Sequence, residues 1–231
     1  MTETEETPKR HLRWDTCYNA RDLGGYATDD GGTTRWGALI RSDSVGRLNA
    51  QGRAALEAYG VRTIIDLRVP VEVRDEPSPF TEHADITTHY LPLDPNDRAI
   101  SKAVAAHKEA GLSYTAAINA AYLETSQPQI AAILRAVADA PDGGIVVHCH
   151  AGRDRTGLIV ALLLGAAGVS AATISADYAL SFSALSETMD ATLAHFDSAY
   201  GGIAAYLRAI GVTDDEIARI RHRLRTDEPP T

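Results

Sequence analysis

The sequence predicts an α/β protein, with a central, mostly parallel sheet flanked by helices. Over the first 170 residues, short runs of β-branched residues alternate with amphipathic helical stretches, which is the pattern of strand–helix units. The composition, 45% hydrophobic and 23% charged, is that of a globular domain. The longest nearly apolar run, residues 158–169, is shorter than the roughly 20 residues of a membrane span and indicates a buried core helix.

The first half of the chain contains three predicted strands and one clear helix. A turn at 29–32 leads into the first strand. The helix covers residues 50–59, with Asn49 as its N-cap and Gly60 just after its end. The strands are predicted at residues 38–41, 61–66 and 86–93.

The second half is predicted to be mainly helical. Residues 94–125 are rich in alanine and polar residues, which indicates one or two helices outside the main core. The buried strand 143–148 is preceded by a helix over 127–140, with proline in its first turn, and is followed by helices to the end of the chain. We expect these at 156–167, 170–180 and 184–200, then two short ones, the last opening with a capping box from Thr213 to Glu216. The whole chain, 1–231, is predicted to form one domain with disordered tails at 1–10 and 226–231.

The net charge and the cysteine content limit the functional classes to which this protein can belong. The net charge of −9 disfavours binding to nucleic acid, and without a polybasic run it also disfavours membrane lipid as a partner. An anionic substrate therefore needs a local positive pocket. Cys17 and Cys149 are the only cysteines, too few for a disulfide scaffold or a four-cysteine zinc site, and no metal or cofactor is expected. The acidic N-terminus has no apolar signal segment, so we expect a cytoplasmic protein with reduced thiols.

The stretch VVHCHAGRDRTG, residues 146–157, combines the features of a catalytic anion site. A strand that turns directly into a helix aims backbone N–H groups and the positive end of the helix dipole at one point. Gly152 allows close backbone approach, and Arg155 can fold back to hold two phosphate oxygens. The same surroundings are expected to lower the pKa of Cys149 from about 8.5 to about 4–6, giving a thiolate placed for attack on phosphorus.

Other loop residues have predicted supporting roles. His148 is expected to hold the loop by hydrogen bonding rather than carry a proton, and Thr156 to donate a hydrogen bond to the thiolate. A lone cysteine is more often inert core, and that interpretation is preferred for Cys17. For Cys149 the combination of strand, cysteine, arginine and helix favours catalysis. The residues predicted to bind phosphate are His150, Ala151, Gly152, Arg153, Asp154 and Arg155.

This loop resembles the His-Cys-x5-Arg-Ser/Thr signature of the cysteine-dependent phosphatases. Its Ala-Gly-Arg-Asp-Arg-Thr-Gly form is similar to the bacterial protein tyrosine phosphatase B family. The segments 19–26, 36–44, 61–73 and 200–213 follow the order of that family, so the resemblance covers nearly the whole chain apart from the tails and 94–125.

The resemblance implies Cys149 as nucleophile, Arg155 and the loop backbone as phosphate ligands, and Arg153 at a basic position where the best-known pattern has lysine. It also implies activity on phosphotyrosine, to varying degrees on phosphoserine and phosphothreonine, and in some members on phosphoinositides. The family's helical lid would correspond to residues 94–125.

The sequence leaves two candidates for the general acid, and it leaves the roles of two further charged stretches open. Asp154, inside the loop, is preferred as general acid over Asp66, which ends a strand. Arg68 lies at the same predicted sheet edge as Asp66 and is a candidate supporting residue. Asp22, in the RDLGG stretch, either shapes the site or caps a structural turn.

Three other functions compete with a protein tyrosine phosphatase. A sulfurtransferase or arsenate-reductase-like enzyme also uses a cysteine loop, but such a redox cycle needs a resolving thiol, and only Cys17 is available. A phosphotyrosine-binding pseudophosphatase commonly lacks the cysteine or the arginine, and both are present here. A phosphoinositide phosphatase is the alternative within the same enzyme class. The preferred partner is a phosphotyrosine-containing protein or another phosphate monoester.

Overall fold

The computed structural model describes residues 10–94 and 97–226, and the α/β prediction is confirmed. Five strands form the main sheet in the spatial order β1 (Arg21–Asp22), β3 (Leu39–Ser42), β6 (Gly144–His148), β4 (Val61–Asp66) and β5 (Thr87–Tyr90). All neighbours are parallel except β1, which pairs antiparallel with β3. A separate pair, β2 (Thr33–Thr34) and β7 (Arg225–Thr226), joins the segment between β1 and β3 to the C-terminal end of the described chain.

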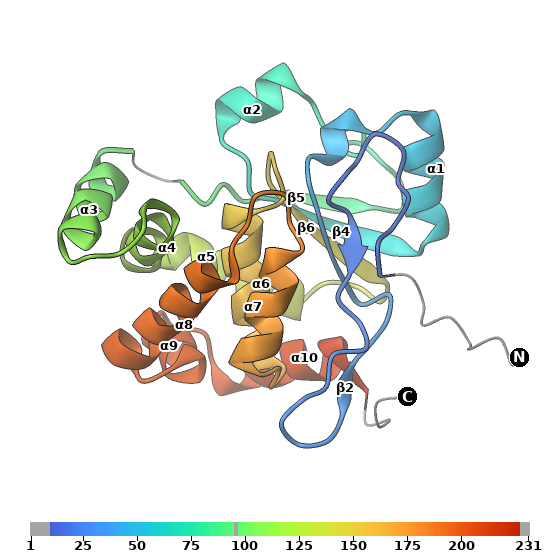
Figure 1. The fold of residues 1–231 in the computed structure, drawn as a ribbon. Helices are drawn as coiled ribbons and strands as arrows, with labels where there is room; N and C mark the ends of the chain where they lie inside the picture. Colours follow the sequence, from blue (N-terminus) through green and yellow to red (C-terminus); the bar gives the residue numbers. More distant parts are fainter. Residues whose placement is uncertain (1–9, 95–96, 227–231) are drawn as a thin grey trace, which may run out of the picture.

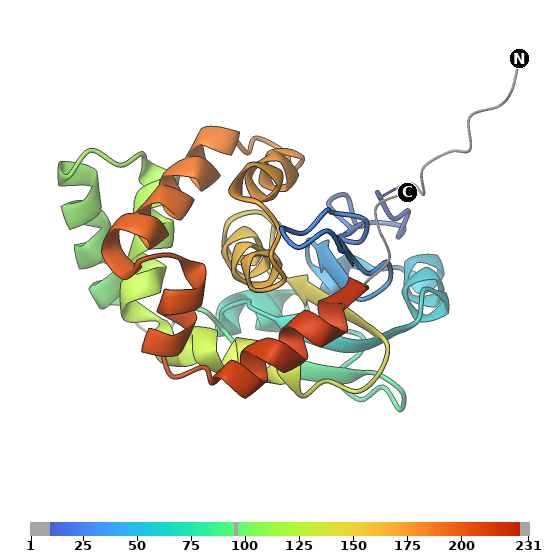
Figure 2. The same cartoon turned by 90° about the horizontal axis from the view of Figure 1, so that it is seen from below.

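Helices lie on both faces of this sheet (Figures 1 and 2). The described helices are α1 (Ala50–Ala58), α2 (Pro70–Asp75), α3 (Asp97–Glu109), α4 (Tyr114–Thr125), α5 (Gln127–Ala138), α6 (Asp154–Ala166), α7 (Ala171–Ala179), α8 (Ser186–Tyr200), α9 (Ile203–Ala209) and α10 (Asp214–Leu224). Among the described residues, no helix is both long enough and apolar enough to cross a bilayer.

Alternating side chains of the central strands enter two separate cores. On β6, Ile145 and Val147 belong to a large core formed with the helices from α4 onward, while Val146 belongs to a smaller core formed with α1 and the N-terminal segment. Because successive side chains of a strand point to opposite faces, a strand covered on both sides reads as a continuous apolar run. This explains why GIVVH contains no polar residue until His148, where the loop begins.

Local sequence signals place most element ends correctly. Asn49 caps α1 through a side-chain bond from the Gly52 amide, and the capping box of Thr213 and Glu216 starts α10. The strand at 61–66 has the predicted bounds. Helix α6 begins at Asp154 rather than at Thr156, so the expected loop is shorter and Asp154 is a helical residue.

Two expectations about the periphery are wrong in part. The region 94–125, where one or two helices were expected, contains α3 and α4, but α4 is not outside the core: most of its residues are buried, and Leu123 lies in the large core. Its alanines are small enough for close packing on every side, which the weak amphipathic pattern did not reveal. The predicted disordered tails lie mostly outside the described residues, but Arg10 donates a hydrogen bond to the Asp22 carbonyl and Thr226 pairs with Thr33 in the small sheet.

Candidate active site

The cysteine loop lies at the carboxyl end of β6, between the carboxyl ends of its two parallel neighbours. Ser42 of β3 and Asp66 of β4 are both in register with His148, so the segments after these strands flank the loop. The loop then enters α6 at Asp154. Ligand sites in parallel sheets collect at this edge, and the first amides of α6 are directed toward it.

Gly152 is required where the loop turns. Its φ of +65° lies in the left-handed region, and an added Cβ would stand 2.3 Å from the Ser42 carbonyl oxygen and 2.5 Å from the Asp43 amide nitrogen. Any side chain here would therefore clash with the main chain of the segment after β3.

The carbonyl groups of the loop accept hydrogen bonds from residues outside the loop. The His148 carbonyl accepts from the Leu67 amide at 2.9 Å, and the His150 carbonyl from the Ser44 amide at 3.2 Å. The carbonyls of Ala151, Gly152 and Arg153 accept from side chains, as set out below. In a trans peptide the N–H points opposite to the C=O, and the described chain has no cis peptide. The amides that follow these carbonyls therefore face the interior of the loop, and such a group of inward N–H donors is suited to bind an anion.

Two side chains from the first sheet strands provide these outer bonds. Asn19 donates from Nδ2 to the Ala151 and Gly152 carbonyls at 3.1 and 3.0 Å. Arg41 of β3 donates from Nη2 to the Gly152 and Arg153 carbonyls at 2.9 and 3.2 Å. These two side chains thus fix the loop backbone from its outer side, opposite the side that the loop amides face.

A buried carboxylate orients both of these side chains. Asp177 of α7 pairs with Arg41 at 2.7 Å and with Arg21 at 3.0 Å, and both guanidinium groups are fully buried. Arg21 also donates to Asn19 Oδ1 at 2.6 Å, which turns the amide nitrogen of Asn19 toward the loop. Burial raises the pKa of Asp177, but the two arginines outweigh it and hold the pKa at about 2.

Arg155, in the first turn of α6, lies between acidic groups. Its Nη1 and Nη2 donate to the two carboxylate oxygens of Glu72 on α2 at 2.7 and 2.6 Å, and Nη1 is 3.6 Å from Asp94. Tyr122 of α4 hydrogen-bonds to Asp94, and burial together with that carboxylate raises the pKa of the phenol. The helix expected to form part of a lid therefore reaches the arginine of the loop.

Asp154 is held at the rim of the loop. Its carboxylate accepts hydrogen bonds from Nε and Nη2 of Arg153 at 3.1 Å, and its Oδ1 accepts from the Tyr178 hydroxyl at 2.7 Å. Burial and Asp154 together raise the pKa of Tyr178, so the phenol stays a donor at neutral pH. The side chain of Asp154 remains 29% exposed, which is compatible with contact to a bound substrate.

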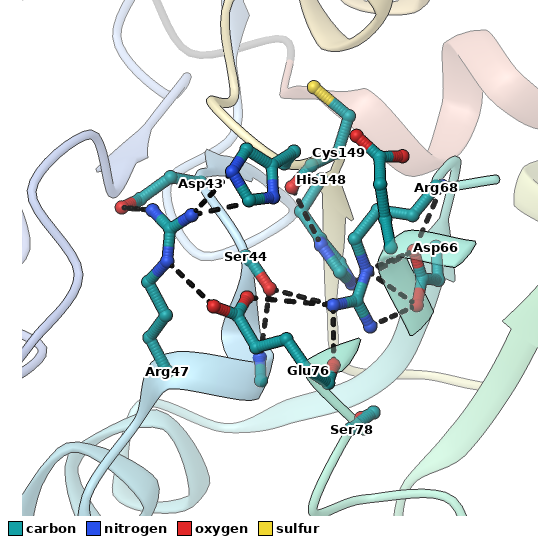
Figure 3. Close-up of polar contacts among 12 residues, drawn as sticks. Asp43, Ser44, Arg47, Asp66, Arg68, Glu76, Ser78, His148 and Cys149 are labelled. Carbon is teal, nitrogen blue, oxygen red and sulfur yellow. Dashed lines mark hydrogen bonds and ion pairs between the residues drawn. The ribbon is translucent and has the colours of Figure 1, made fainter. Parts of the chain in front are cut away.

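Asp66, the alternative candidate for the general acid, does not lie on the inner side of the cysteine loop. It lies beneath the loop and forms a buried, bidentate ion pair with Arg68, with a shortest distance of 2.7 Å (Figure 3). Burial alone would raise its pKa, but the hydrogen bonds from Arg68 hold the pKa below the usual range. An ionised carboxylate committed to a neighbouring arginine has no proton to donate, so the structure contradicts the prediction of an acid at Asp66.

Arg68, a candidate supporting residue, joins two segments beneath the loop. From Nη1 it donates to Ser44 Oγ at 2.9 Å and to the Glu76 carbonyl at 2.7 Å, so it joins the segments that follow β3 and β4. The sulfur of Cys149 points away from this network (Figure 3). The pair with Asp66 thus supports the loop from below rather than touching a ligand.

The remaining predicted loop residues have distinct environments. His148 is fully buried, with Nδ1 3.3 Å from the Cys149 carbonyl oxygen, and burial lowers its pKa, so the imidazole is uncharged at neutral pH. The Thr156 hydroxyl is buried without a hydrogen-bond partner among the described residues; the predicted bond to the thiolate is not formed. The His150 side chain is exposed and its Nε2 lies 2.9 Å from Arg47 Nη2.

Asp22 belongs to a structural turn, which is the second of the two interpretations that the sequence left open. Its carboxylate accepts from the amides of Gly24 and Gly37 at 2.6 and 2.7 Å and from the Tyr59 hydroxyl at 2.5 Å. Gly37 precedes β3, whereas the loop lies at the other end of that strand. Burial raises the pKa of Asp22 despite these donors.

Several residues near the loop escaped the sequence analysis. They come from four elements and two loop segments, and none stands in a recognisable motif with the cysteine; they are Asn19, Arg41, Glu72, Asp94, Tyr122, Asp177 and Tyr178. Asn19, Arg41 and Glu72 lie in segments that resemble the family, but nothing in those segments assigned these three residues a role at the loop. The others are recognised only when the fold brings them together.

Comparison with known proteins identifies the family. The model of the tyrosine phosphatase family matches residues 12–187 and 182–226. A tyrosine-protein phosphatase of Nostoc commune is 31% identical over 222 residues, covering 81% of this chain and 74% of its own. The triple specificity protein phosphatase PtpB of Mycobacterium tuberculosis is 32% identical over 187 residues, covering 70% and 66%. A putative tyrosine-protein phosphatase of Cupriavidus necator is 31% identical over 186 residues, covering 73% and 62%. The chain therefore belongs to the tyrosine phosphatase family and is a protein tyrosine phosphatase.

Proposed function

We propose that Cys149 is the nucleophile of this phosphatase and that the loop from His150 to Arg155 binds the phosphoryl group. In the first step the thiolate attacks phosphorus in line, the S–P bond forms, and the bond from phosphorus to the tyrosine oxygen breaks. In the second step water attacks phosphorus, the S–P bond breaks, inorganic phosphate leaves and the thiolate is restored. The observation that carries this proposal is the outward bonding of the loop carbonyls, which turns the amides toward the position of a phosphate above Cys149.

Arg155 is proposed to hold the transferring phosphoryl group. A guanidinium has five N–H donors, and the contact with Glu72 uses one from Nη1 and one from Nη2, so further donors remain. Glu72 fixes the plane of the guanidinium, and Arg155 in turn holds the pKa of Glu72 below its ordinary value despite partial burial. A guanidinium that is already oriented before the substrate binds stabilises the charge that develops on the phosphoryl group in the transition state.

Asp154 is proposed as the general acid of the first step. The departing phenoxide needs a proton, and such assistance accelerates hydrolysis by about 10²–10⁴-fold. Asp154 is adjacent to Arg155 in sequence, and its carboxylate is held at the loop by Arg153 and Tyr178.

Phosphotyrosine is the substrate we propose, because two exposed aromatic residues lie next to, or are bonded through their main chain to, residues of the loop region. Tyr18, 86% exposed, precedes the loop ligand Asn19, and Phe182, 90% exposed, has its carbonyl bonded to Arg153. Exposed aromatic rings beside the loop can stack against the phenyl ring of the substrate. The name of the mycobacterial relative, a triple specificity phosphatase, supports testing phosphoserine, phosphothreonine and phosphoinositides as well.

The nucleophile is tested by substitution. Cys149→Ser should abolish hydrolysis of an aryl phosphate while phosphate binding and fold persist, because a hydroxyl is not ionised at neutral pH. Arg155→Lys should lose at least about 100-fold in kcat/KM, because an ammonium cannot form the planar fork. Cys17→Ser is the matched control and should retain activity. Substantial turnover by Cys149→Ser would contradict the assignment.

The phosphoinositide alternative is tested by comparing substrates at equal concentration. We expect phosphotyrosine peptides to be hydrolysed with the highest kcat/KM and Phe182→Ala to lower that value specifically. Faster turnover of phosphoinositide vesicles would favour the alternative instead. The predicted cytoplasmic location belongs to the same proposal, because the reaction requires Cys149 as a free thiolate.

A further inference from the structure

A second group of ligating side chains lies away from the cysteine loop, between three helices. His107 of α3, Glu124 of α4 and His195 of α8 each offer one ligand atom, and these atoms all lie within 4.8 Å of one another. Helix α4 packs against both α3 and α8, and the three lie on the same side of the molecule (Figure 1). These residues are widely separated in the sequence, so no spacing motif pointed to them.

The nitrogens of this group lack the hydrogen bonds that buried polar atoms normally make. Nε2 of His107 is 2.9 Å from Glu124 Oε1, yet it is not aligned for a hydrogen bond with it or with any other described group. Nε2 of His195 is also buried without a hydrogen-bond partner among the described residues. The two imidazole rings meet edge to face, with 5.3 Å between their centroids. Buried atoms without a partner are uncommon and imply a ligand or another compensating group.

A simple ion pair between His107 and Glu124 does not explain this arrangement. It leaves the second imidazole nitrogen unpaired, and two protonated histidines at this separation would repel each other. A divalent ion accounts for all three groups, because neutral imidazoles and a carboxylate are the ligands of three-residue zinc sites. Tetrahedral ligands about 2.1 Å from zinc stand about 3.4 Å apart, so modest side-chain rotations would close the observed group around an ion.

We propose that His107, Glu124 and His195 bind one divalent transition-metal ion, with Zn²⁺ as the preferred ion. Two imidazoles and one carboxylate favour zinc over the hard ions calcium and magnesium, which select oxygen ligands. A bound ion would fasten α3 and α4 to α8. Helix α4 also carries Tyr122, which bonds Asp94 beside the phosphate-binding arginine, so the ion would stabilise the helices next to the active site without taking part in the reaction.

The test measures metal binding by the full chain rather than catalysis. Cys149→Ser serves as the background, because a thiolate would itself bind zinc. Chelator-treated protein is titrated with Zn²⁺ by calorimetry, and Co²⁺ is used as a second probe, since tetrahedral coordination gives visible absorption bands. We expect one equivalent of Zn²⁺ per chain and, at a hundredfold excess over the dissociation constant, a rise in melting temperature of about 5–10 °C.

Three ligand variants and a matched control separate this site from adventitious binding. His107→Gln, His195→Gln and Glu124→Gln should each weaken Zn²⁺ binding at least about 100-fold. His83→Gln should not, because His83 stands 3.6 Å from Glu57 in a pair without a second histidine. Glu124, with a side chain 42% exposed, is the variant least expected to disturb folding. Absence of stoichiometric binding, or equal binding by Glu124→Gln and His83→Gln, would overturn the proposal.

Discussion

The Asp177→Asn substitution tests whether the loop is held from behind by a buried charge network. Asp177 is the single described carboxylate between Arg21 and Arg41, at 3.0 and 2.7 Å. An asparagine of the same shape removes the charge and leaves two buried guanidinium groups without compensation. Breaking a buried pair in this way costs about 3–5 kcal/mol of unfolding free energy. For a chain of this size, that corresponds to a fall in melting temperature of roughly 6–20 °C.

The same substitution has a predictable pH dependence. The folded-state pKa of Asp177 is about 2, against an ordinary value of 3.8. Because the folded pKa is depressed, the contribution to stability is complete above the unfolded value and is lost as the pH falls through the folded value. This lowering of the pKa corresponds to a contribution on the order of 2 kcal/mol to the free energy of unfolding. The stability difference between wild type and Asp177→Asn should therefore shrink by this order between pH 5 and pH 2.

The assay combines unfolding with kinetics. Because Arg41 also binds the Gly152 carbonyl, loosening it should displace the loop and lower kcat/KM for an aryl phosphate at least about tenfold. Asp139→Asn is the control, since Asp139 pairs with Arg219 on the surface and its side chain is 65% exposed. An Asp177→Asn protein that melts within 2 °C of wild type and keeps full activity would refute the network as the support of the loop.

Three further predictions concern the loop itself. Iodoacetamide near neutral pH should label Cys149 and spare Cys17, because burial and a nearby carboxylate raise the pKa of Cys17 to about 12; equal labelling by mass spectrometry would contradict this. Gly152→Ala should lower kcat/KM by at least about 100-fold, because its Cβ would stand 2.3 Å from a main-chain oxygen; normal kinetics would show that the loop tolerates the displacement. Asp154→Asn should slow hydrolysis of phenyl phosphate far more than hydrolysis of an activated aryl phosphate, and it should remove the basic limb of the pH–rate profile. Asp66→Asn should lower the melting temperature without that substrate selectivity. The reverse pattern would exchange the roles of the two aspartates.

The sequence predicted those features that depend on neighbours along the chain. The strand at 61–66, the cap at Asn49 and the strand–loop–helix around Cys149 all follow from local periodicity and capping chemistry. The position of Asp66 at a strand end correctly indicated the edge where the site lies. Its role was misjudged because Arg68, two residues later, folds back onto it and takes both carboxylate oxygens.

Contacts between distant segments could not be predicted in this way. Glu72 meets Arg155 only because α2 follows β4 at the same edge of the sheet as α6. Asn19 reaches the loop only because Arg21 and Asp177 turn its amide toward it. No pattern within one segment specifies such partners, because the sheet order that joins them is set by the packing of the whole core.

The network behind the loop also explains how an acidic protein attracts a phosphate. The chain carries a net charge of −9, so its distant field repels anions. Directly behind the loop, however, two buried arginines share one carboxylate, which leaves one net positive charge there. Burial and the neighbouring Arg41 lower the pKa of Arg21 only to about 10, so the Arg21 guanidinium stays protonated at neutral pH. A charge held in a low-dielectric interior is screened less than a surface charge. We therefore expect the attraction for phosphate to be short-ranged and confined to the proposed site, where the inward amides and Arg155 add to it.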